Sequence, residues 1–497
     1  MIRYTALWLF VFGLIWYAWK RDWVRSLCAL VAMLAVLERP DMPKEIFGIN
    51  GLNPFNLGFL GICGGWLAAR RRETNTWDVP PIMTALLVLY LLVTTVSTAR
   101  LLLDPSYLVI YQRPDFLVSS MRELITDYGV NTFKWLLPAL LLIQGCRGEE
   151  RSRWVVMGVL AMYAVLAILV IKQMPLGYLL DGEALQQRAA NILQRRVGYH
   201  RVDLATMFSG AAWAMLAARP LFSDRRIQLG LAGLFGITTI ALALTGGRTG
   251  YATWCVVGLA MSMLKWRKYL LLAPVALAVV LVAAPGISQR MLQGIQGSNT
   301  DKHLITSGRN VIWPFVIDKI RERPIAGFGR QAWVRTNLRL QAALNTGENF
   351  GHPHNAYLEF ALDNGLIGIS VLLPLLLYVL WTAQRLFRDP DPLRSAAGGL
   401  AFAMTFSYAI AAFGAQTFYP REGTVGMWCF IALAIRVARD TSRATASAAV
   451  PAKASMGSFR PSARPGWRQP STGAAGQVPR PRPAGLRPGA RVRQWPR

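Results

Sequence analysis

Residues Trp154–Ile171 read WVVMGVLAMYAVLAILVI, an apolar run that contains no charged side chain. A helix of this length crosses most of the ~30 Å hydrocarbon core of a bilayer, because each residue adds about 1.5 Å. Similar runs lie at 80–98, 227–245, 269–284 and 366–380, and hydrophobic residues make up 53% of the 497 residues. Short alternating strands, which a transmembrane β-barrel requires, are not evident. The sequence therefore predicts an all-α polytopic membrane protein.

Apolar runs continue along most of the chain, and they mark thirteen candidate spans. These lie near residues 4–19, 23–37, 55–69, 80–98, 133–146, 153–172, 202–219, 227–245, 249–264, 269–284, 365–383, 396–415 and 424–438. Lys and Arg gather on every second connection, for example at 70–72, 147–153 and 265–268. Basic connections stay on the cytoplasmic side. We therefore expect about 12–13 transmembrane helices, an outer N-terminus, one large outer loop over 285–353 and a cytoplasmic tail.

Four regions follow from this pattern. We expect transmembrane helices over 1–284, an extracytoplasmic catalytic loop with amphipathic helices over 285–364, transmembrane helices over 365–440 and a disordered tail over 441–497. The tail is rich in Arg and Pro. It holds eleven Lys and Arg and no acid, leaving +17 of the net charge of +28 for the rest. Such a tail touches anionic lipid headgroups. No folded nucleic-acid-binding module is evident, so no nucleic-acid partner is expected.

A Gly-rich turn places an arginine near the membrane surface. It reads LTGGRTG over residues 244–250, between two apolar spans, and its arginine is Arg248. Glycine lets the backbone turn sharply and approach a ligand closely. An arginine at this depth is costly, which favours a functional role over a side chain that snorkels to lipid phosphates. Arg201, at the outer end of span 202–219, is a further candidate to line the same cleft.

The outer loop is predicted to be helical. Residues 309–320 carry apolar side chains at helical spacing, with Ser307 as a candidate N-cap and Arg309 in the first turn. Arg323-Pro324 ends this helix, and a second amphipathic stretch runs through 333–340. The loop therefore forms a small helical cap on the membrane, and its arginines, Arg330 among them, suit phosphate recognition.

Two of the four histidines close the loop, in His352-Pro353-His354-Asn355. Pro353 suits the first turn of a helix that ends near Asn364. The helix dipole at this position favours a neutral His354, which can accept a proton from a hydroxyl group. The alternatives are helix capping and a zinc site, but no third His or Cys lies at a suitable spacing. The five cysteines are interpreted as packing residues, and neither a metal nor a cofactor is expected.

Four features together resemble the O-antigen ligase and O-antigen polymerase superfamily of bacterial envelope enzymes. His354-Asn355 is followed, nine residues later, by Gly365-Leu366-Ile367-Gly368. The loop contains Thr306-Ser307-Gly308-Arg309 with Trp313, and then Arg323-Pro324 and Gly327-Phe328-Gly329. The Gly-rich turn ends at Arg248, and the single large outer loop lies late in the chain. The resemblance covers about residues 190–440.

The resemblance implies a metal-independent glycosyltransferase of the GT-C type in the bacterial inner membrane, with its site facing the periplasm. Such enzymes join a glycan from an undecaprenyl-diphosphate carrier to an acceptor hydroxyl on a lipid, a glycan or a protein. In this chain, His354 would act near the acceptor hydroxyl, while Arg248 and Arg309 would hold the diphosphate. The expected substrate-binding residues are Arg201, His352, Asn355, Glu359 and Arg330.

Ligase and polymerase share this donor chemistry and differ in the acceptor, so both stay open. The main alternative from another class is a transporter or flippase of lipid-linked glycan. Transporters carry ionisable residues deep within their spans and often an internal repeat. Here the spans are nearly free of acids at mid-depth and no repeat is evident. A purely structural scaffold would leave the histidine motif unexplained.

Overall fold

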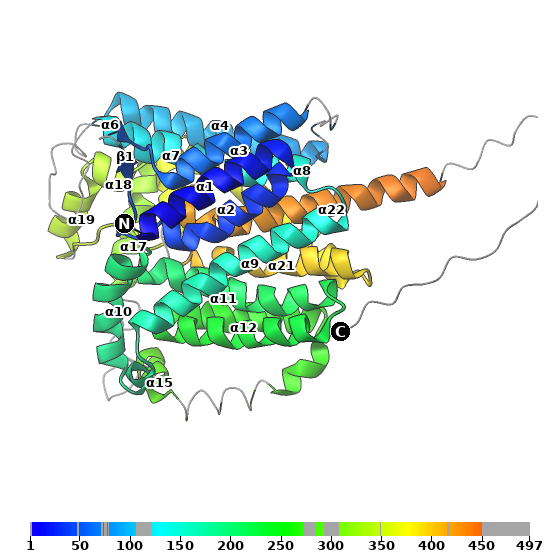
Figure 1. Ribbon diagram of the computed structural model, residues 1–497. Coiled ribbons are helices and arrows are strands. Elements are labelled where there is room, and N and C mark those ends of the chain that lie inside the picture. The colour runs from blue at the N-terminus through cyan, green and yellow to red at the C-terminus, as the bar shows by residue number, and fades with distance from the viewer. Residues whose placement is uncertain are drawn as a thin grey trace, which may run out of the picture. The chain divides into compact units, whose positions relative to one another are not determined.

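The computed structural model describes residues 2–449 apart from 47–48, 71–72, 74–76, 78, 106–120, 273, 275–277, 279–281, 283, 293–307, 348 and 415–417. Residues Met1–Ala446 form one compact unit, and Ser447–Arg497 form another. In the first unit nearly every described element is a helix (Figure 1). The short strands β1 (Glu45–Ile46) and β2 (Ile49–Asn50) pair as an antiparallel hairpin. The predicted all-α class is confirmed.

Most of the helices up to residue 264 follow the predicted spans. They are α1 (Ile2–Lys20), α2 (Trp23–Leu37), α3 (Pro54–Arg70), α4 (Pro81–Leu103), α6 (Met121–Leu124), the π-helix η1 (Ile125–Val130), α7 (Asn131–Lys134), α8 (Leu137–Gly145), α9 (Gly148–Gln173), the 3-10 helix η2 (Leu176–Leu180), α10 (Gly182–Val197), α11 (Arg201–Ala218), the 3-10 helix η3 (Arg219–Leu221), α12 (Arg225–Leu244) and α13 (Arg248–Leu264). The span expected at 133–146 is broken between α7 and α8. Pro138 lies at the start of α8, where its missing N–H group is tolerated.

The later helices form the outer loop and the parts of the chain on either side of it. They are the 3-10 helix η4 (Arg267–Leu272), α15 (Pro285–Leu292), α17 (Arg309–Glu322), α18 (Ala332–Arg335), α19 (Leu338–Thr346), α20 (Ala356–Arg388), α21 (Pro392–Ala411), the 3-10 helix η5 (Glu422–Thr424) and α22 (Val425–Ala449). The span expected at 269–284 lies partly outside the described residues. The amphipathic stretch expected over 333–340 forms two helices, α18 and α19.

Among the described residues, four helices are long and apolar enough to cross a membrane by length and composition: α4, α9, α12 and α20. Helix α11 lies among α9, α12, α13 and α21 and is buried along most of its length. Small side chains allow its close contact with α21, because a Cβ on Gly210 would lie 3.0 Å from the carbonyl oxygen of Ala403. Ser209 and Ser407 also share a hydrogen bond of 2.6 Å across this contact. Small residues and buried hydroxyl bonds are typical of helix packing in membranes.

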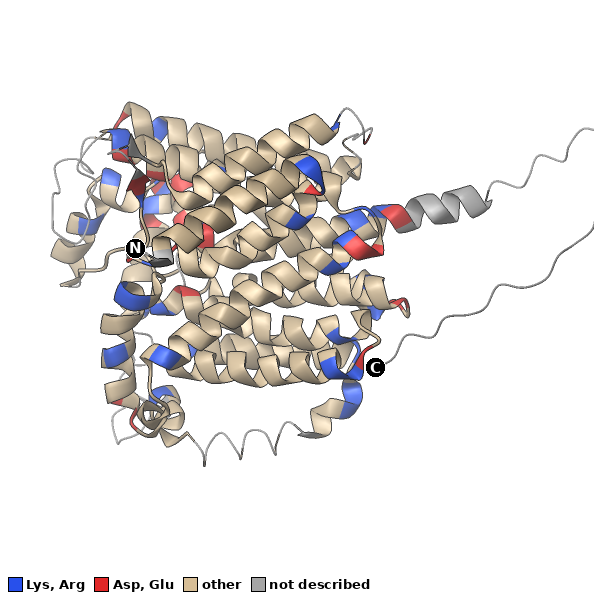
Figure 2. Ribbon diagram, in the orientation of Figure 1, with Lys and Arg blue, Asp and Glu red and all other residues tan. Residues whose placement is uncertain are grey.

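The connections between helices meet in two separate groups. Those predicted to be cytoplasmic contact one another: Arg151 binds Asp22 at 3.3 Å and Glu73 at 2.9 Å, and Lys265 binds the carbonyl oxygen of Asp389 at 3.1 Å. Figure 2 shows charged residues mainly at the two ends of the bundle, with uncharged helix between them. This grouping agrees with the alternation of the connections along the sequence and describes a multi-pass membrane protein.

The helices of the outer loop lie at one end of the bundle. Figure 1 shows α17, α18 and α19 there, together with α10, which runs across the ends of α11 and α12. Helix α10 buries Leu185, Ala189, Leu193 and Val197, four residues apart, against the bundle. An amphipathic helix with such a stripe lies flat on its support. This end of the bundle carries the candidate site.

Candidate functional site

The backbone turns sharply at the His-Pro-His-Asn segment. His354 has a φ of 53°, in the left-handed region that few non-glycine residues adopt. Asn355 follows as the N-cap of α20, and its side chain accepts the N–H groups of Tyr357 at 3.0 Å and Leu358 at 3.2 Å. The expectation that Pro353 lies in the first turn of this helix is wrong. The asparagine cap starts the helix at Ala356 instead.

The two histidine side chains lie against each other, and we call them the histidine pair. Their ring centroids are 3.9 Å apart. The Nδ1 atom of His352 accepts the backbone N–H of His354 at 3.2 Å. A neutral His352 therefore carries its proton on Nε2. The ring of His354 also meets the ring of Phe350 edge-on, with centroids 5.6 Å apart. These contacts fix the orientation of both rings.

Both imidazoles are held in the neutral form. Burial lowers the pKa of His354 to about 4, and the positive charges of Arg309 and His200 add to this effect. Burial also lowers the pKa of His352 to about 3, aided by His354, His200, Arg421 and Arg309. We expected a neutral His354 from the helix dipole alone. The structure shows burial as the main cause, followed by the neighbouring charges of Arg309 and His200.

Arg309 reaches the site from the first residue of α17. The N-cap of this helix is Gly308, with a φ of 75°, whereas the expected cap, Ser307, lies outside the described residues. The Nη2 atom of Arg309 donates to the carbonyl oxygen of Gly414 at 3.4 Å. One turn further along α17, the Nε1 atom of Trp313 donates to the carbonyl oxygen of Pro353 at 3.1 Å. Helix α17 is therefore bonded directly to the segment that carries the histidine pair.

The Gly-rich turn between α12 and α13 lies on the first turns of α11. Arg201 begins α11, and its Nη1 atom donates to the carbonyl oxygen of Gly246 at 3.4 Å. Gly246 has a φ of 66°, which glycine adopts without strain. A Cβ on Gly250 would lie 2.7 Å from the Cβ of Ala205 and push the two helices apart. Arg201 therefore lies beside the turn that carries Arg248.

A fourth arginine joins this group from α15. Arg290 is buried, and burial lowers the pKa of its guanidinium, with further lowering by Arg248 and then Arg201. Burial, and after it the charge of Arg248, lowers the pKa of Arg309 in the same way. The positive charge of Arg248 therefore acts on Arg201, Arg290 and Arg309. We call Arg201, Arg248, Arg290 and Arg309 the arginine cluster.

The sequence showed Arg290 only as one of many basic loop residues, and tight packing places it here. Helix α15 packs against α10 and η2. A Cβ on Gly182 would lie 2.7 Å from the carbonyl oxygen of Gly286 and 3.0 Å from the Cγ atom of Arg290. The backbone N–H of Gly182 also donates to Gln289 at 3.1 Å. Two glycines facing each other across this contact are the signal that sequence reasoning missed.

A second group of charges borders the histidine pair and was not expected. Arg421, in the connection between α21 and α22, forms an ion pair with Asp203 in the first turn of α11. Burial lowers the pKa of Arg421, but the carboxylates of Asp203, Glu422 and Glu359 together raise it above its ordinary value. The first turn of α11 thus connects the arginine cluster, through Arg201, with this more acidic group, through Asp203.

The remaining predicted residues lie in different surroundings. Asn355, Glu359 and Asp363 are all buried, so the polar stripe expected along this helix faces protein. Arg330 is also buried, and its Nη1 atom donates to the backbone carbonyl oxygen of Tyr128 and to the hydroxyl groups of Thr98 and Thr132. These partners belong to α4, η1 and α7. The structure therefore surrounds the Arg330 side chain with protein groups.

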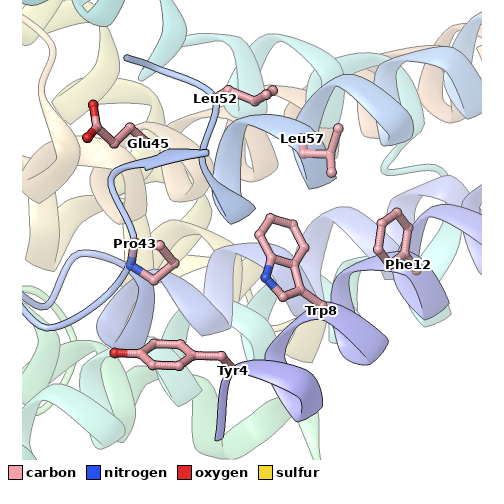
Figure 3. A pocket seen from close by; sticks show the side chains of 7 residues that line it. All are labelled: Tyr4, Trp8, Phe12, Pro43, Glu45, Leu52 and Leu57. Atoms are coloured by element: carbon pink, nitrogen blue, oxygen red, sulfur yellow. The ribbon is translucent and has the colours of Figure 1, made fainter. Parts of the chain in front are cut away.

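No group of three or more His, Cys, Asp and Glu among the described residues is arranged to hold a metal ion. An apolar groove of about 520 Å³ opens beside α1, and none of the candidate site residues lines it (Figure 3). It is lined by Tyr4, Trp8, Phe12, Pro43, Glu45, Leu52 and Leu57. The histidine pair and the arginine cluster are thus distinct from this groove.

A histidine pair beside several arginines offers a proton acceptor next to positive charges that can bind an anion. Residues 233–373 match the profile of the family described as O-Antigen ligase. The matched part contains Arg248, Arg290, Arg309 and both histidines of the pair. The resemblance to the O-antigen ligase and polymerase superfamily is thereby confirmed, and it supports glycan transfer in envelope glycan biosynthesis. No curated protein matches the chain.

Proposed function

We propose that this protein transfers a glycan from an undecaprenyl-diphosphate carrier to an acceptor hydroxyl at the periplasmic face of the bacterial inner membrane. The observation that carries the proposal is the neutral His354 beside the arginine cluster. A proton acceptor and a cationic site for a diphosphate are the two parts that such a transfer needs. The alternation of basic connections along the sequence supports the periplasmic orientation.

In the proposed step, the acceptor oxygen bonds to the anomeric carbon of the donor glycan. The bond from that carbon to the diphosphate oxygen breaks, and undecaprenyl diphosphate leaves with the electron pair. The acceptor proton passes to the imidazole of His354. Arg248 and Arg309 offset the negative charge that grows on the leaving group, and Arg201 and Arg290 lie beside them. Guanidinium groups can supply this electrostatic stabilisation themselves, and we propose that the reaction is independent of a metal.

Donor binding also increases the basicity of His354 in this proposal. The pKa of His354 is about 4 without substrate, which makes it a weak base at neutral pH. After burial, Arg309 is the largest cause of that low pKa. A diphosphate bound to Arg309 offsets its positive charge, so the pKa of His354 rises as the donor binds. His354 then accepts a proton most readily when the donor is in place.

His352 and Asn355 hold His354 in position. His352 accepts the backbone N–H of His354, and Asn355 caps the helix that starts after it. Glu359 lies one turn into α20, and its carboxylate is among those that raise the pKa of Arg421. We propose that Asp203 and Arg421 form the wall that faces the sugar hydroxyls, since carboxylates and guanidinium groups hydrogen-bond hydroxyls readily. The buried Glu359 supports Arg421 electrostatically in this proposal.

The test is a transfer assay with the purified full-length protein, undecaprenyl-diphosphate glycan and separate lipid A core and glycan acceptors. The wild-type protein is expected to release undecaprenyl diphosphate with one class of acceptor, and that class decides between ligase and polymerase. His354→Ala should lower the turnover by about a hundredfold or more. Arg309→Gln should also lower it strongly.

The matched control is Arg321→Gln. Arg321 lies on the same helix as Arg309, its side chain is 75% exposed and it pairs with Asp318 at 2.9 Å. This variant should keep wild-type turnover. Full activity in a correctly folded His354→Ala variant would contradict the proposed role of His354.

A further inference from the structure

Helix α20 is broken at Gly365, and a segment of the outer loop fills the break. Gly365 has φ 62° and ψ −158°, so α20 bends there; we had expected the helix to end at this residue. The backbone N–H of Phe328 donates to the backbone carbonyl oxygen of Leu362 at 2.8 Å, and that of Gly329 donates to the backbone carbonyl oxygen of Asp363 at 2.7 Å. Beyond the bend, the backbone N–H of Leu366 donates to the carbonyl oxygen of Pro324 at 2.7 Å. Loop residues thus pair with backbone groups that a break leaves without helical partners.

This contact explains why glycines stand on both sides of it. A Cβ on Gly365 would lie 2.4 Å from the carbonyl oxygen of Ile325. A Cβ on Gly327 would lie 2.5 Å from the carbonyl oxygen of Leu362. Both positions require a left-handed backbone and contact another backbone directly. Two motifs noted in the sequence, around 323–329 and 365–368, are therefore two halves of one contact.

Three side chains secure this contact, and we call Arg330, Asp363 and Tyr419 the clamp. The carboxylate of Asp363 accepts the N–H of Ala332 at 3.0 Å and that of Gln331 at 3.3 Å, which caps α18. The hydroxyl of Tyr419 donates to the same carboxylate at 3.0 Å and accepts from Asn364 at 2.8 Å. The side chains of Asp363, Asn364 and Tyr419 are all buried, so the bonds among them are expensive to lose.

Arg330 extends the clamp to the N-terminal helices. Its backbone N–H donates to the carbonyl oxygen of Ser97 at 3.2 Å. Its Nη1 atom donates to Tyr128 at 2.6 Å and to Thr132 at 2.7 Å, and its guanidinium lies 4.2 Å from the ring centre of Tyr419. With an exposed fraction of 6%, this side chain is better placed to hold helices together than to bind a substrate.

The clamp lies at the far end of two helical segments that both start at the candidate site. Helix α17 runs from Arg309 to Glu322, and the first part of α20 runs from Ala356 to the bend at Gly365. Ile312 and Val316 of α17 belong to the same buried cluster as Leu362 of α20. At the site end, Trp313 bonds to Pro353. The two segments are thus joined at both ends, with Arg309 and His354 at the same end.

We propose that Arg330, Asp363 and Tyr419 are positioning residues that set the placement of Arg309 relative to His354. This inference rests on the proposed function for its catalytic consequence, and on the contacts above for its structural part. It gives Arg330 a role in positioning rather than in substrate binding. Two helices that share anchors at both ends keep their starting residues at a fixed separation. Precise separation of this kind governs the rates of enzymes.

The test uses Tyr419→Phe and Asp363→Asn, which keep the shape of each side chain and weaken the clamp. The first measurement is the pKa of His354. It is obtained from carbon-13 NMR spectra of labelled histidine in the full-length protein, recorded across pH. The chain has only four histidines, so His354→Gln assigns the signal. If Arg309 moves away when the clamp loosens, the pKa of His354 should rise from about 4 toward 6.5.

The second measurement is turnover, with kcat expected to fall about tenfold while the KM for the donor stays unchanged. Arg330→Lys should behave in the same way, whereas a donor-binding Arg330 would raise that KM. Ser407→Ala is the control, because it removes a buried hydroxyl that bonds to Ser209 and Thr206 within the bundle. It should leave both the pKa and kcat unchanged.

The outcomes separate the clamp from the proposed function. An unchanged pKa of His354 in both clamp variants overturns the inference whether or not the protein transfers glycan. A raised pKa with unchanged kcat, in a protein whose His354→Ala variant is inactive, also overturns it. A raised pKa in a protein that transfers no glycan supports the clamp and contradicts the proposed function alone.

Discussion

The Nδ1 atom of His352 accepts the backbone N–H of His354 at 3.2 Å, and the two rings lie with their centroids 3.9 Å apart. This bond supports the left-handed backbone of His354, which has a φ of 53°. A non-glycine residue in that region is strained by about 1–3 kcal/mol and persists only when its surroundings hold it there. The strained residue, His354, is the one for which we propose proton transfer, whereas His352 holds the backbone of His354 in place. The two histidines therefore have separate tasks.

The pH dependence of the reaction should show two different midpoints. The general base must be unprotonated, so kcat/KM should stay level above about pH 5 and fall as the pH drops through about 4, the pKa of His354 in the free protein. The midpoint in kcat reports the donor-bound protein and should lie higher, because the diphosphate offsets Arg309. Initial rates at varied donor concentration across pH 3–8 measure both. Equal midpoints would contradict the effect of the donor on His354.

Arg248→Lys should lower kcat/KM by about tenfold or more although it keeps the positive charge. Arginine holds a phosphate with two parallel hydrogen bonds, whereas lysine offers a point charge. The control is Arg225→Lys. Arg225 is exposed and begins α12, at the end of that helix opposite the Gly-rich turn that carries Arg248. Steady-state rates of undecaprenyl diphosphate release measure the effect. A variant that matches the wild type would show that charge alone is enough at this position.

His352→Asn should keep most of the activity, and His352→Ala should not. The side-chain oxygen of asparagine can accept the N–H of His354, as the Nδ1 atom does in the wild type. The alanine variant leaves this N–H without its partner, at a cost of about 1–3 kcal/mol. Thermal unfolding and turnover of the two variants are compared in the same detergent. If both variants behave alike, the bond between the histidines has no role in positioning.

Asn355→Ala should lower the free energy of unfolding by about 1 kcal/mol, because it removes the cap of α20. Asn355→Asp should restore most of this loss, since aspartate accepts the same two N–H groups. The measurement is the midpoint of thermal unfolding, with turnover recorded at a temperature where both variants are folded. Equal unfolding midpoints for the alanine variant and the wild type would contradict the capping role.

Features with a local signal could be predicted from the sequence. The helical spans follow from the length of their apolar runs, and the helical loop follows from its spacing of apolar residues. Arg201 and Arg248 could be proposed because they lie at the outer ends of spans, and Arg309 and His354 because they lie in short motifs of the outer loop. In the structure the charge of Arg248 acts on Arg201 and Arg309, and that of Arg309 acts on His354, while their catalytic roles stay predictions.

Other features depend on contacts between distant parts of the chain. Arg421 and Asp203 form an ion pair across 218 residues, and no local pattern indicates that pairing. Arg290 lies at the site because Gly182 and Gly286 let α15 and α10 meet closely. The start of α20 was misplaced because Pro353 and Asn355 both suit a helix start, and the side-chain cap of Asn355 prevails. The bend at Gly365 depends on a loop segment that fills it.

The central claim is that the arginine cluster holds the diphosphate of a lipid-linked glycan beside His354. Its most direct test is a cryo-electron microscopy structure of the full-length protein with a non-transferable undecaprenyl-diphosphate glycan. We predict that the diphosphate lies within hydrogen-bonding distance of Arg248 and Arg309, with the anomeric carbon facing His354. A diphosphate bound away from these arginines, or a glycan remote from His354, would contradict the account.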